Sequence, residues 1–283
     1  MSHIMSAEPA AEPDPFEGVV IPSKPQILVD IQMAGNDTEK VIDLIEKDTG
    51  ISASVLKTIN SPYFGLRVNV ASIGKAVMLL GIDSVVAIVN SQALRANMTN
   101  NTDVNLGEYW DSSMDVAKAA GSIATQSKMC ARDTAYTLGL FHNCGIPILL
   151  QKHPNFMETV KLAYSDAKQG VLKVERQATR LDHAYVGYKL CKLWNLSDKL
   201  CQAIRYHHHG KAFFSEDKFS SEIKILGAVL MFAEHVAEVH KTLGGQSEEH
   251  NWAEIRPIVL ETLDLNEESY QNIKEYILET VYA

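Results

Sequence analysis

Residues 135–150, AYTLGLFHNCGIPILL, constrain the fold of this chain more than any other stretch, because nearly all of them are apolar. A helix that is apolar on every side is buried in a protein core, so we predict a core helix at the centre of a helical domain. His142 and Asn143 interrupt the run. Buried polar side chains need hydrogen-bond partners or a metal ion, so the two residues are either a satisfied core pair or part of a binding site.

The apolar residues of the other segments recur with the period of a helix. We expect a long helix over 109–129, another over 220–243, and two terminal helices over 252–263 and 266–281. Residues suited to cap the starts of helices are Ser72, Asp182 and Ser197. No alternating pattern indicates a strand. The sequence therefore predicts an all-α fold.

Changes in composition divide the chain into three parts. Residues 1–20 are rich in Pro, Ala and acidic side chains and lack an apolar face, which predicts a flexible lead. The polar stretch 99–107 is the best domain boundary. We therefore predict an N-terminal helical subdomain over 21–107 and a second helical bundle over 108–283.

Charge and cysteine content exclude several classes of protein. The net charge of −9 opposes a broad phosphate-binding face, so nucleic acid is not an expected partner. No run of about 20 apolar residues could cross a bilayer, and no membrane partner is expected. The cysteines Cys130, Cys144, Cys191 and Cys201 form no CxxC pair, which is typical of reduced core thiols in a cytoplasmic protein.

Several motifs, in order, resemble the HDOD family. VLKTINSPYFG and SIGKAVMLLG lie within residues 51–81, and WDSS, LGLFHNCG, DHAYVGYKLCKLWNL and AIRYHHH follow. The resemblance covers about residues 20–240. It implies an all-helical protein whose N-terminal helical subdomain packs on a degenerate relative of the HD metal-dependent phosphohydrolase bundle.

The resemblance also implies where a vestigial site would lie. An active HD site needs several His and Asp ligands, because divalent ions must be held while a bound water is activated. Here Ser112 stands where the first ligand His would be, and Asn143 replaces the aspartate of the His-Asp dyad. The matched positions are Ser112, His142, Asn143, His183, His207, His208 and Glu234. Of these, His142, His183, His207, His208 and Glu234 are the candidate metal ligands; we expect no cofactor, with one divalent ion as the alternative.

Structural interpretations compete with each of these assignments. His183 could be a packed surface residue, and imidazoles at 207–209 are favoured at a helix C-terminus when charged. Asn60 and Ser61, with Tyr63, are the candidate interaction surface on the N-terminal helices, but the first two residues are also typical of a helix stop and turn.

We therefore predict a non-catalytic signal-transduction protein that binds a protein partner or a small ligand through its N-terminal helices or the groove between its halves. The alternative is a metal-dependent phosphohydrolase acting on a nucleotide or cyclic dinucleotide. A nucleotide ligand remains an option although no Gly-rich phosphate loop is present. A Cys144 nucleophile beside His142 is disfavoured, because side chains two residues apart on a helix point in different directions. The sequence does not indicate an oligomeric state.

Overall fold

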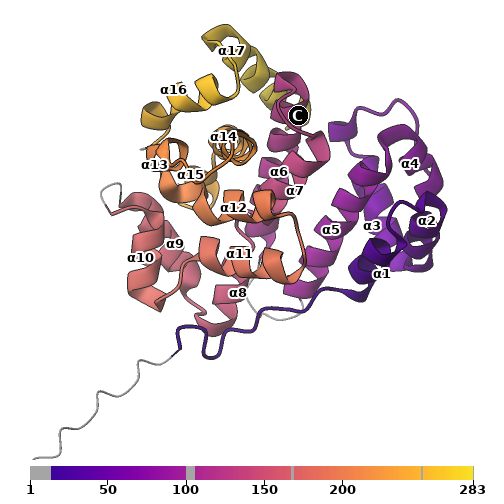
Figure 1. Cartoon of the computed structure of the whole chain (residues 1–283), viewed down its shortest axis with the longest axis horizontal. Helices are drawn as coiled ribbons and strands as arrows, with labels where there is room; N and C mark the ends of the chain where they lie inside the picture. Colours follow the sequence, from indigo (N-terminus) through magenta and orange to yellow (C-terminus); the bar gives the residue numbers. More distant parts are fainter. Residues whose placement is uncertain (1–13, 100–105, 167–168, 250, 283) are drawn as a thin grey trace, which may run out of the picture.

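The computed structural model describes residues 14–99, 106–166, 169–249 and 251–282. These residues form helices joined by turns, and they contain no strand (Figure 1). The predicted all-α fold class is confirmed. None of the helices in these ranges combines the length and the apolar character needed to cross a membrane.

The N-terminal half is a cluster of short helices, drawn in indigo and purple in Figure 1. Its elements are α1 (Gln26–Ala34), α2 (Thr38–Lys47), α3 (Thr49–Ile59), η1 (Pro62–Phe64), α4 (Ile73–Leu80) and α5 (Ile82–Thr99). Val41 and Ile45 on α2, and Val55 and Ile59 on α3, are buried at i, i+4 spacing. This spacing puts each pair on one helix face, which is why amphipathic helices of this length pack into one core.

The C-terminal half is a bundle arranged around α14 (Figure 1). Its elements are α6 (Gly107–Ser127), α7 (Arg132–Phe141), α8 (Gly145–Lys152), α9 (Phe156–Ser165), α10 (Val171–Thr179), α11 (His183–Leu193), α12 (Asp198–Tyr206), η2 (His207–His209), α13 (Lys211–Ser215), α14 (Ser221–Val236), α15 (Val239–Thr242), α16 (Trp252–Thr262), α17 (Glu267–Tyr276) and η3 (Ile277–Val281). Helix α14 packs against α6, α12 and α16. Gly139 lets α7 approach α6 closely, because a Cβ there would lie 2.7 Å from the Cα of Ala117.

The three predicted caps are confirmed. Ser72, Asp182 and Ser197 accept hydrogen bonds from the backbone N–H of Lys75, Tyr185 and Leu200. Ser220 caps α14 in the same way through the N–H of Ile223. A cap satisfies one of the N–H groups that the first helical turn leaves unpaired.

The prediction of one continuous core helix over 135–150 is wrong, because the stretch forms two helices. Every residue of the stretch is nevertheless buried. Helix α7 ends at Phe141, residues 142–144 form a turn, and α8 begins at Gly145. A Cβ on Gly145 would lie 2.0 Å from the carbonyl oxygen of His183, so α8 starts where it touches α11. Two short buried helices have the same all-round apolar pattern as one long helix, and the pattern alone could not separate them.

The predicted single helix over 220–243 is also wrong. Helix α14 ends at Val236, Glu238 adopts the left-handed conformation with φ 50°, and α15 begins at Val239. This turn redirects the chain while it keeps Val236 and Val239 buried. The spacing of apolar residues indicates which positions are buried, but it does not indicate where a helix ends and the chain turns.

The two halves meet through Tyr63 in η1. Its ring stacks on Tyr136 of α7 with centroids 6.0 Å apart, and the guanidinium of Arg132 lies 4.9 Å from its centroid. Its hydroxyl fits against Gly121 on α6, where a Cβ would be 2.4 Å away. Helix α5 ends at Thr99 and α6 begins at Gly107, and residues 100–105 of the predicted boundary lie outside the described residues.

The N-terminal segment crosses the bundle before it reaches α1 (Figure 1). Residues 1–13 of the predicted flexible lead lie outside the described residues. From residue 14 onward, the ring of Phe16 packs on Tyr185 with centroids 5.7 Å apart, and the Nζ of Lys152 donates to the carbonyl of Glu17. The indole Nε1–H of Trp194 donates to the carbonyl of Pro22 at 3.0 Å. These contacts hold the segment against α8 and α11.

Candidate metal and ligand site in the C-terminal bundle

The turn between α7 and α8 carries the buried pair His142 and Asn143, which are 1% and 0% exposed. The close approach at Gly145 brings this turn to the first residue of α11, His183. His207 and His208 follow α12, and Glu234 lies near the end of α14. Segments far apart in the sequence therefore converge on one region of the bundle.

The ring of His142 is fixed in one tautomer. Its Nδ1 lies 2.6 Å from the carbonyl oxygen of Gly139, which can only accept, so Nδ1–H donates. Burial lowers the pKa of His142 to about 3, and the ring is neutral at pH 7. Its Nε2 therefore presents a lone pair, which lies 3.6 Å from Oε1 of Glu234.

His183 is held by a buried carboxylate. Its Nδ1 lies 2.8 Å from both carboxylate oxygens of Glu175, and its backbone N–H donates to Oε2 at 2.9 Å. Glu175 is 0% exposed. Asp182, the cap of α11, accepts from Arg176 at 2.6 Å and from Arg205 at 3.4 Å. These contacts fix the start of α11 and direct the Nε2 of His183 away from Glu175.

His207 turns its Nε2 toward His183. Its Nδ1–H donates to the carbonyl of Ile204 at 2.7 Å, and burial lowers its pKa well below the usual value. The Nε2 atoms of His183 and His207 are 3.4 Å apart. Two nitrogens bound at about 2.05 Å to a tetrahedral ion are about 3.3 Å apart. The pair therefore has the spacing of two ligands of one ion, or of a hydrogen bond if one ring is protonated.

The surrounding groups fit a divalent transition metal. Candidate ligand atoms of His183, His207 and His208 lie within 4.8 Å of one another. Metal-bound histidines usually donate their other ring N–H to a carboxylate or a carbonyl, as His142, His183 and His207 do here. His142 Nε2, His208 Nε2 and both amide atoms of Asn143 are buried without a hydrogen-bond partner. Such orphaned groups are costly unless something binds them.

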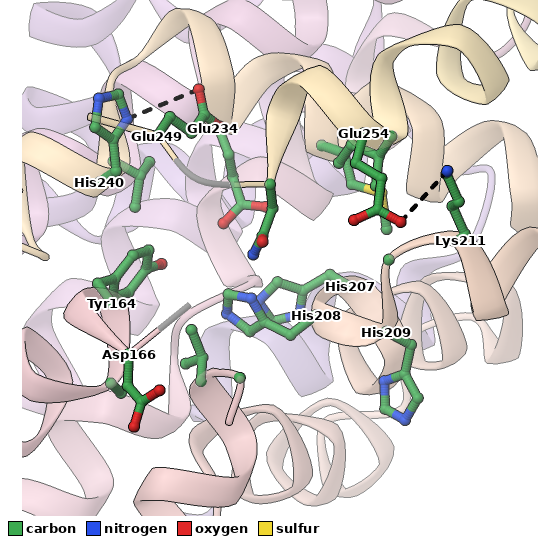
Figure 2. Close-up of a pocket in the computed structure, with 18 of the residues that line it drawn as sticks. Tyr164, Asp166, His207, His208, His209, Lys211, Glu234, His240, Glu249 and Glu254 are labelled. Atoms are coloured by element: carbon green, nitrogen blue, oxygen red, sulfur yellow. Dashed lines mark ion pairs between the residues drawn. The ribbon is translucent and has the colours of Figure 1, made fainter. Parts of the chain in front are cut away.

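A hollow of about 420 Å³ opens over these histidines (Figure 2). It is bounded by α9, η2, α14 and α16, and its lining includes Tyr164, Asp166, His207, His208, His209, Lys211, Glu234, His240, Glu248, Glu249 and Glu254. Burial, reinforced by the charge of Glu249, raises the pKa of Glu234 to about 8. Glu234 is 14% exposed, and it links the hollow to His142.

The structure brings together five of the seven residues predicted for the vestigial site: His142, His183, His207, His208 and Glu234. Asn143 is adjacent to His142 and buried. Ser112, the seventh, has its hydroxyl 3.1 Å from that of Thr242 on α15. Its observed contact is therefore with α15 and not with an imidazole.

The predicted interaction surface of Asn60, Ser61 and Tyr63 forms contacts within the chain. The Nδ2 of Asn60 donates to the carbonyls of Leu56 and Val70, and its Oδ1 accepts from the N–H of Val70. Asn60 follows the last residue of α3, which agrees with the helix-stop interpretation. Ser61 lines a groove between the two halves, and binding of a partner at these residues stays a prediction.

Sequence reasoning missed Glu175 and Tyr164. Glu175 lies on the buried face of α10, four residues after Val171 and four before Thr179. A carboxylate at that spacing on an apolar helix face was the available signal. Tyr164 follows Ala163 on α9 without any such pattern, and only the folded structure brings it to the hollow.

Comparisons with known proteins identify proteins that are similar to this chain. The model of the HDOD domain family matches residues 21–210. An uncharacterised protein of Treponema pallidum is 25% identical over 202 residues, which are 67% of this chain and 38% of that protein. The match thus spans well under half of the relative's length.

Two crystal structures have similar folds. A proposed signal-transduction protein of Marinobacter aquaeolei VT8 is 20% identical with a TM-score of 0.68, and the match covers 95% of this chain and 59% of that one. A proposed phosphohydrolase of Shewanella amazonensis SB2B is 18% identical with a TM-score of 0.67, and the match covers 90% and 87%. At these identities the comparisons establish a common fold.

Proposed function

This chain belongs to the HDOD domain family, and we propose that it is a non-catalytic signal-transduction protein that binds its ligand or partner. The observation that carries the proposal is Asn143, which stands in the dyad where a catalytic relative has a carboxylate and is fully buried. A neutral amide cannot compensate the repulsion between two adjacent cations as a bridging carboxylate does.

The charge of the hollow supports the same conclusion. Five acidic side chains, of which Glu234 is protonated at neutral pH, and a single lysine, Lys211, are among the described residues that line it. Burial lowers the pKa of His207, His208, His209 and His240, so these rings add little positive charge at neutral pH. The negative electrostatic potential of the hollow would repel a negatively charged phosphoester.

We further propose that the histidine cluster holds one divalent ion, with His183 and His207 as ligands and His208 or His142 completing the set. A bound ion would act as a Lewis acid toward an oxygen ligand. The chain itself contributes the orientation of the rings: Glu175 fixes His183, and the carbonyl of Ile204 fixes His207. In a signalling protein such a site stabilises the folded bundle by an amount that grows with the logarithm of the ion concentration above the Kd.

A metal-dependent phosphohydrolase acting on a nucleotide or cyclic dinucleotide is the alternative. The 3.4 Å separation between the Nε2 atoms of His183 and His207 favours it, as does the name of the Shewanella protein. Against it stand Asn143 and the acidic lining of the hollow.

The deciding experiment compares wild type, His142→Ala and Asn143→Asp on a generic phosphodiester and on cyclic dinucleotides, with manganese, nickel or iron under anaerobic conditions. We expect no turnover above background by the wild type. Wild-type turnover that disappears in His142→Ala would establish the enzyme instead. Turnover confined to Asn143→Asp would identify the missing carboxylate as the difference from catalytic relatives.

A further inference from the structure

The hollow over the histidines has an excess of negative charge that the chain does not neutralise. Glu254 pairs with Lys211 at 3.3 Å, and Glu249 with His235 at 2.5 Å. Glu234 is protonated at neutral pH, and Glu248 has no Lys or Arg partner within 4.0 Å among the described residues. The lining thus offers a carboxylate that lacks a cation.

Buried polar atoms also point into the hollow without partners. The hydroxyl of Tyr164 and the Nε2 of His208 are almost fully buried and have no hydrogen bond. Both residues line the hollow, and Figure 2 shows the Tyr164 hydroxyl and the rings of His207 and His208 directed into it. His207 is itself 3% exposed. These atoms are a second sign, independent of the carboxylates, that the hollow receives a polar ligand.

The size and the walls of the hollow suit an organic ligand. Its volume of about 420 Å³ lies within the range of small-molecule sites, whereas one ion with its waters needs only a fraction of it, at about 30 Å³ per water. Met231, Val239 and Ile255 supply apolar wall between the acidic groups. An aliphatic stem would pack there while cationic groups reach the carboxylates.

A divalent ion at the histidines would not remove the negative charge. Such an ion and Lys211 together supply three positive charges, against the four lining carboxylates other than the protonated Glu234. The hollow therefore favours a cation whether or not the ion is bound.

We propose that this hollow binds a ligand that carries primary alkylammonium groups, either a free aliphatic diamine or the side chain of a lysine residue. The carboxylate of Glu248 receives an ammonium group, and the carbonyl oxygen of the neutral Glu234 side chain and the hydroxyl of Tyr164 accept further N–H groups. This inference deepens the proposed binding function of the same site and rests on it, but it does not require the metal ion.

The first test is calorimetric titration of the chelator-treated full chain with 1,4-diaminobutane and with Nα-acetyl-lysine methylamide. We expect saturable binding of at least one of them, weakened when salt is raised from 50 to 500 mM, because exposed charges are screened at that ionic strength. The neutral analogue 1,4-butanediol and inorganic phosphate are the controls and should not bind. Binding of the diamine alone indicates a free amine, and binding of the lysine probe alone indicates a side chain of a partner. Saturation by neither probe overturns the proposal.

The second test uses charge variants with opposite expected signs. Glu248→Gln should raise the Kd for the ammonium probe about two- to fivefold, the range of one exposed ion pair. Lys211→Met should lower it by a similar factor, because it removes the competing cation of the lining. Glu261→Gln, an exposed change on the outer side of α16, should leave the Kd unchanged. Phosphate binding that Lys211→Met weakens would show an anion site and overturn the proposal.

Metal binding is measured separately, so that the two proposals fail independently. Zinc titration of His207→Ala reports on the ion, whereas the ammonium titration above is done in chelator. If His207→Ala loses zinc binding and keeps ammonium binding, both assignments are supported. If the wild type binds the ammonium probe and binds no zinc, the metal-ion proposal alone is refuted.

Discussion

Two of the hollows formed by the described residues differ in the charge of their linings. The hollow over the histidines is lined by five acidic side chains, of which Glu234 is protonated at neutral pH, and by one lysine. The groove between the two halves, about 790 Å³ in volume, is lined by Lys57, Arg95 and Lys118 with Asp48 as its carboxylate. In Figure 1 the helices around them, α9, α13 and α16 in one case and α3 and α5 in the other, lie on different sides of the molecule.

The difference shows why net charge is a poor guide to ligands in this chain. A net charge of −9 opposes anionic partners for the molecule as a whole, yet the groove is locally basic. If a phosphate-bearing ligand or an acidic partner binds this protein, electrostatics favours the groove, where Ser61 also lies. The histidine hollow favours cations. A single site that serves both classes is not expected.

The largest expected effect tests how the histidine hollow is built. In Gly145→Ala the new Cβ would lie 2.0 Å from the carbonyl oxygen of His183, so α8 and α11 must separate. We expect a loss of about 3 kcal/mol in the free energy of unfolding, at the upper end for overpacking. Urea denaturation measures it.

The matched control lies in the other half. Gly74 on α4 has no heavy atom within 4 Å of an added Cβ. Gly74→Ala should be neutral or stabilising by up to about 1 kcal/mol, because Ala is the better helix former. Equal destabilisation by both changes would contradict the close approach at Gly145 as the reason for the break in the core helix.

The next prediction concerns the carboxylate behind the histidines. Glu175→Gln removes the charge that fixes His183 through two contacts of 2.8 Å. We expect zinc affinity, measured by competition with a chromophoric chelator, to fall about 10- to 100-fold, as for other outer-shell partners of metal-bound histidines. Glu158→Gln, an exposed change on α9, is the control. Unchanged affinity in a folded Glu175→Gln would mean that the cluster binds no ion through His183.

A third prediction uses the pKa of Glu234, which burial raises to about 8. Between pH 4.5 and 8 the unfolded chain ionises this carboxyl while the folded chain keeps it protonated, so the folded state loses stability as pH rises. Glu234→Gln removes this loss. In chelator, its stability relative to wild type should increase by about 1 kcal/mol per pH unit in the middle of the window, since one proton gives at most about 1.4 kcal/mol per pH unit.

This measurement needs a control variant and a correction for the pH dependence that His142 contributes. Glu222→Gln on the exposed face of the same helix should show no such slope. The opposite slope comes from His142, whose pKa of about 3 makes the folded chain lose stability as pH falls below about 6.5. A flat difference between Glu234→Gln and wild type from pH 5 to 8 would show that the carboxyl is ionised in the folded chain.

Local chemistry accounts for what the sequence could predict. The caps Ser72, Asp182 and Ser197 act on N–H groups a few residues away, and the spacing of apolar residues depends on each helix by itself. The breaks at residues 142–144 and at Glu238 depend on contacts with other helices, which one segment does not encode. In the site, family motifs identified the histidines, but the role of Glu175 follows from a helix packing that no motif describes.

The smallest expected effect sharpens the comparison between the two hollows. Lys57 in the groove and Lys211 at the acidic hollow are both exposed, so Lys57→Met and Lys211→Met should each change the free energy of unfolding by less than about 0.5 kcal/mol. Their effects on ligand binding should nevertheless differ. Lys211→Met tightens binding of an alkylammonium probe, because it removes the cation beside Glu254, whereas Lys57→Met leaves that affinity unchanged because Lys57 lines the other hollow. Calorimetric titration of both variants under one buffer measures the contrast. Equal tightening by the two changes would mean that the probe responds to the net charge of the molecule, and the distinction between the hollows would then have no functional meaning.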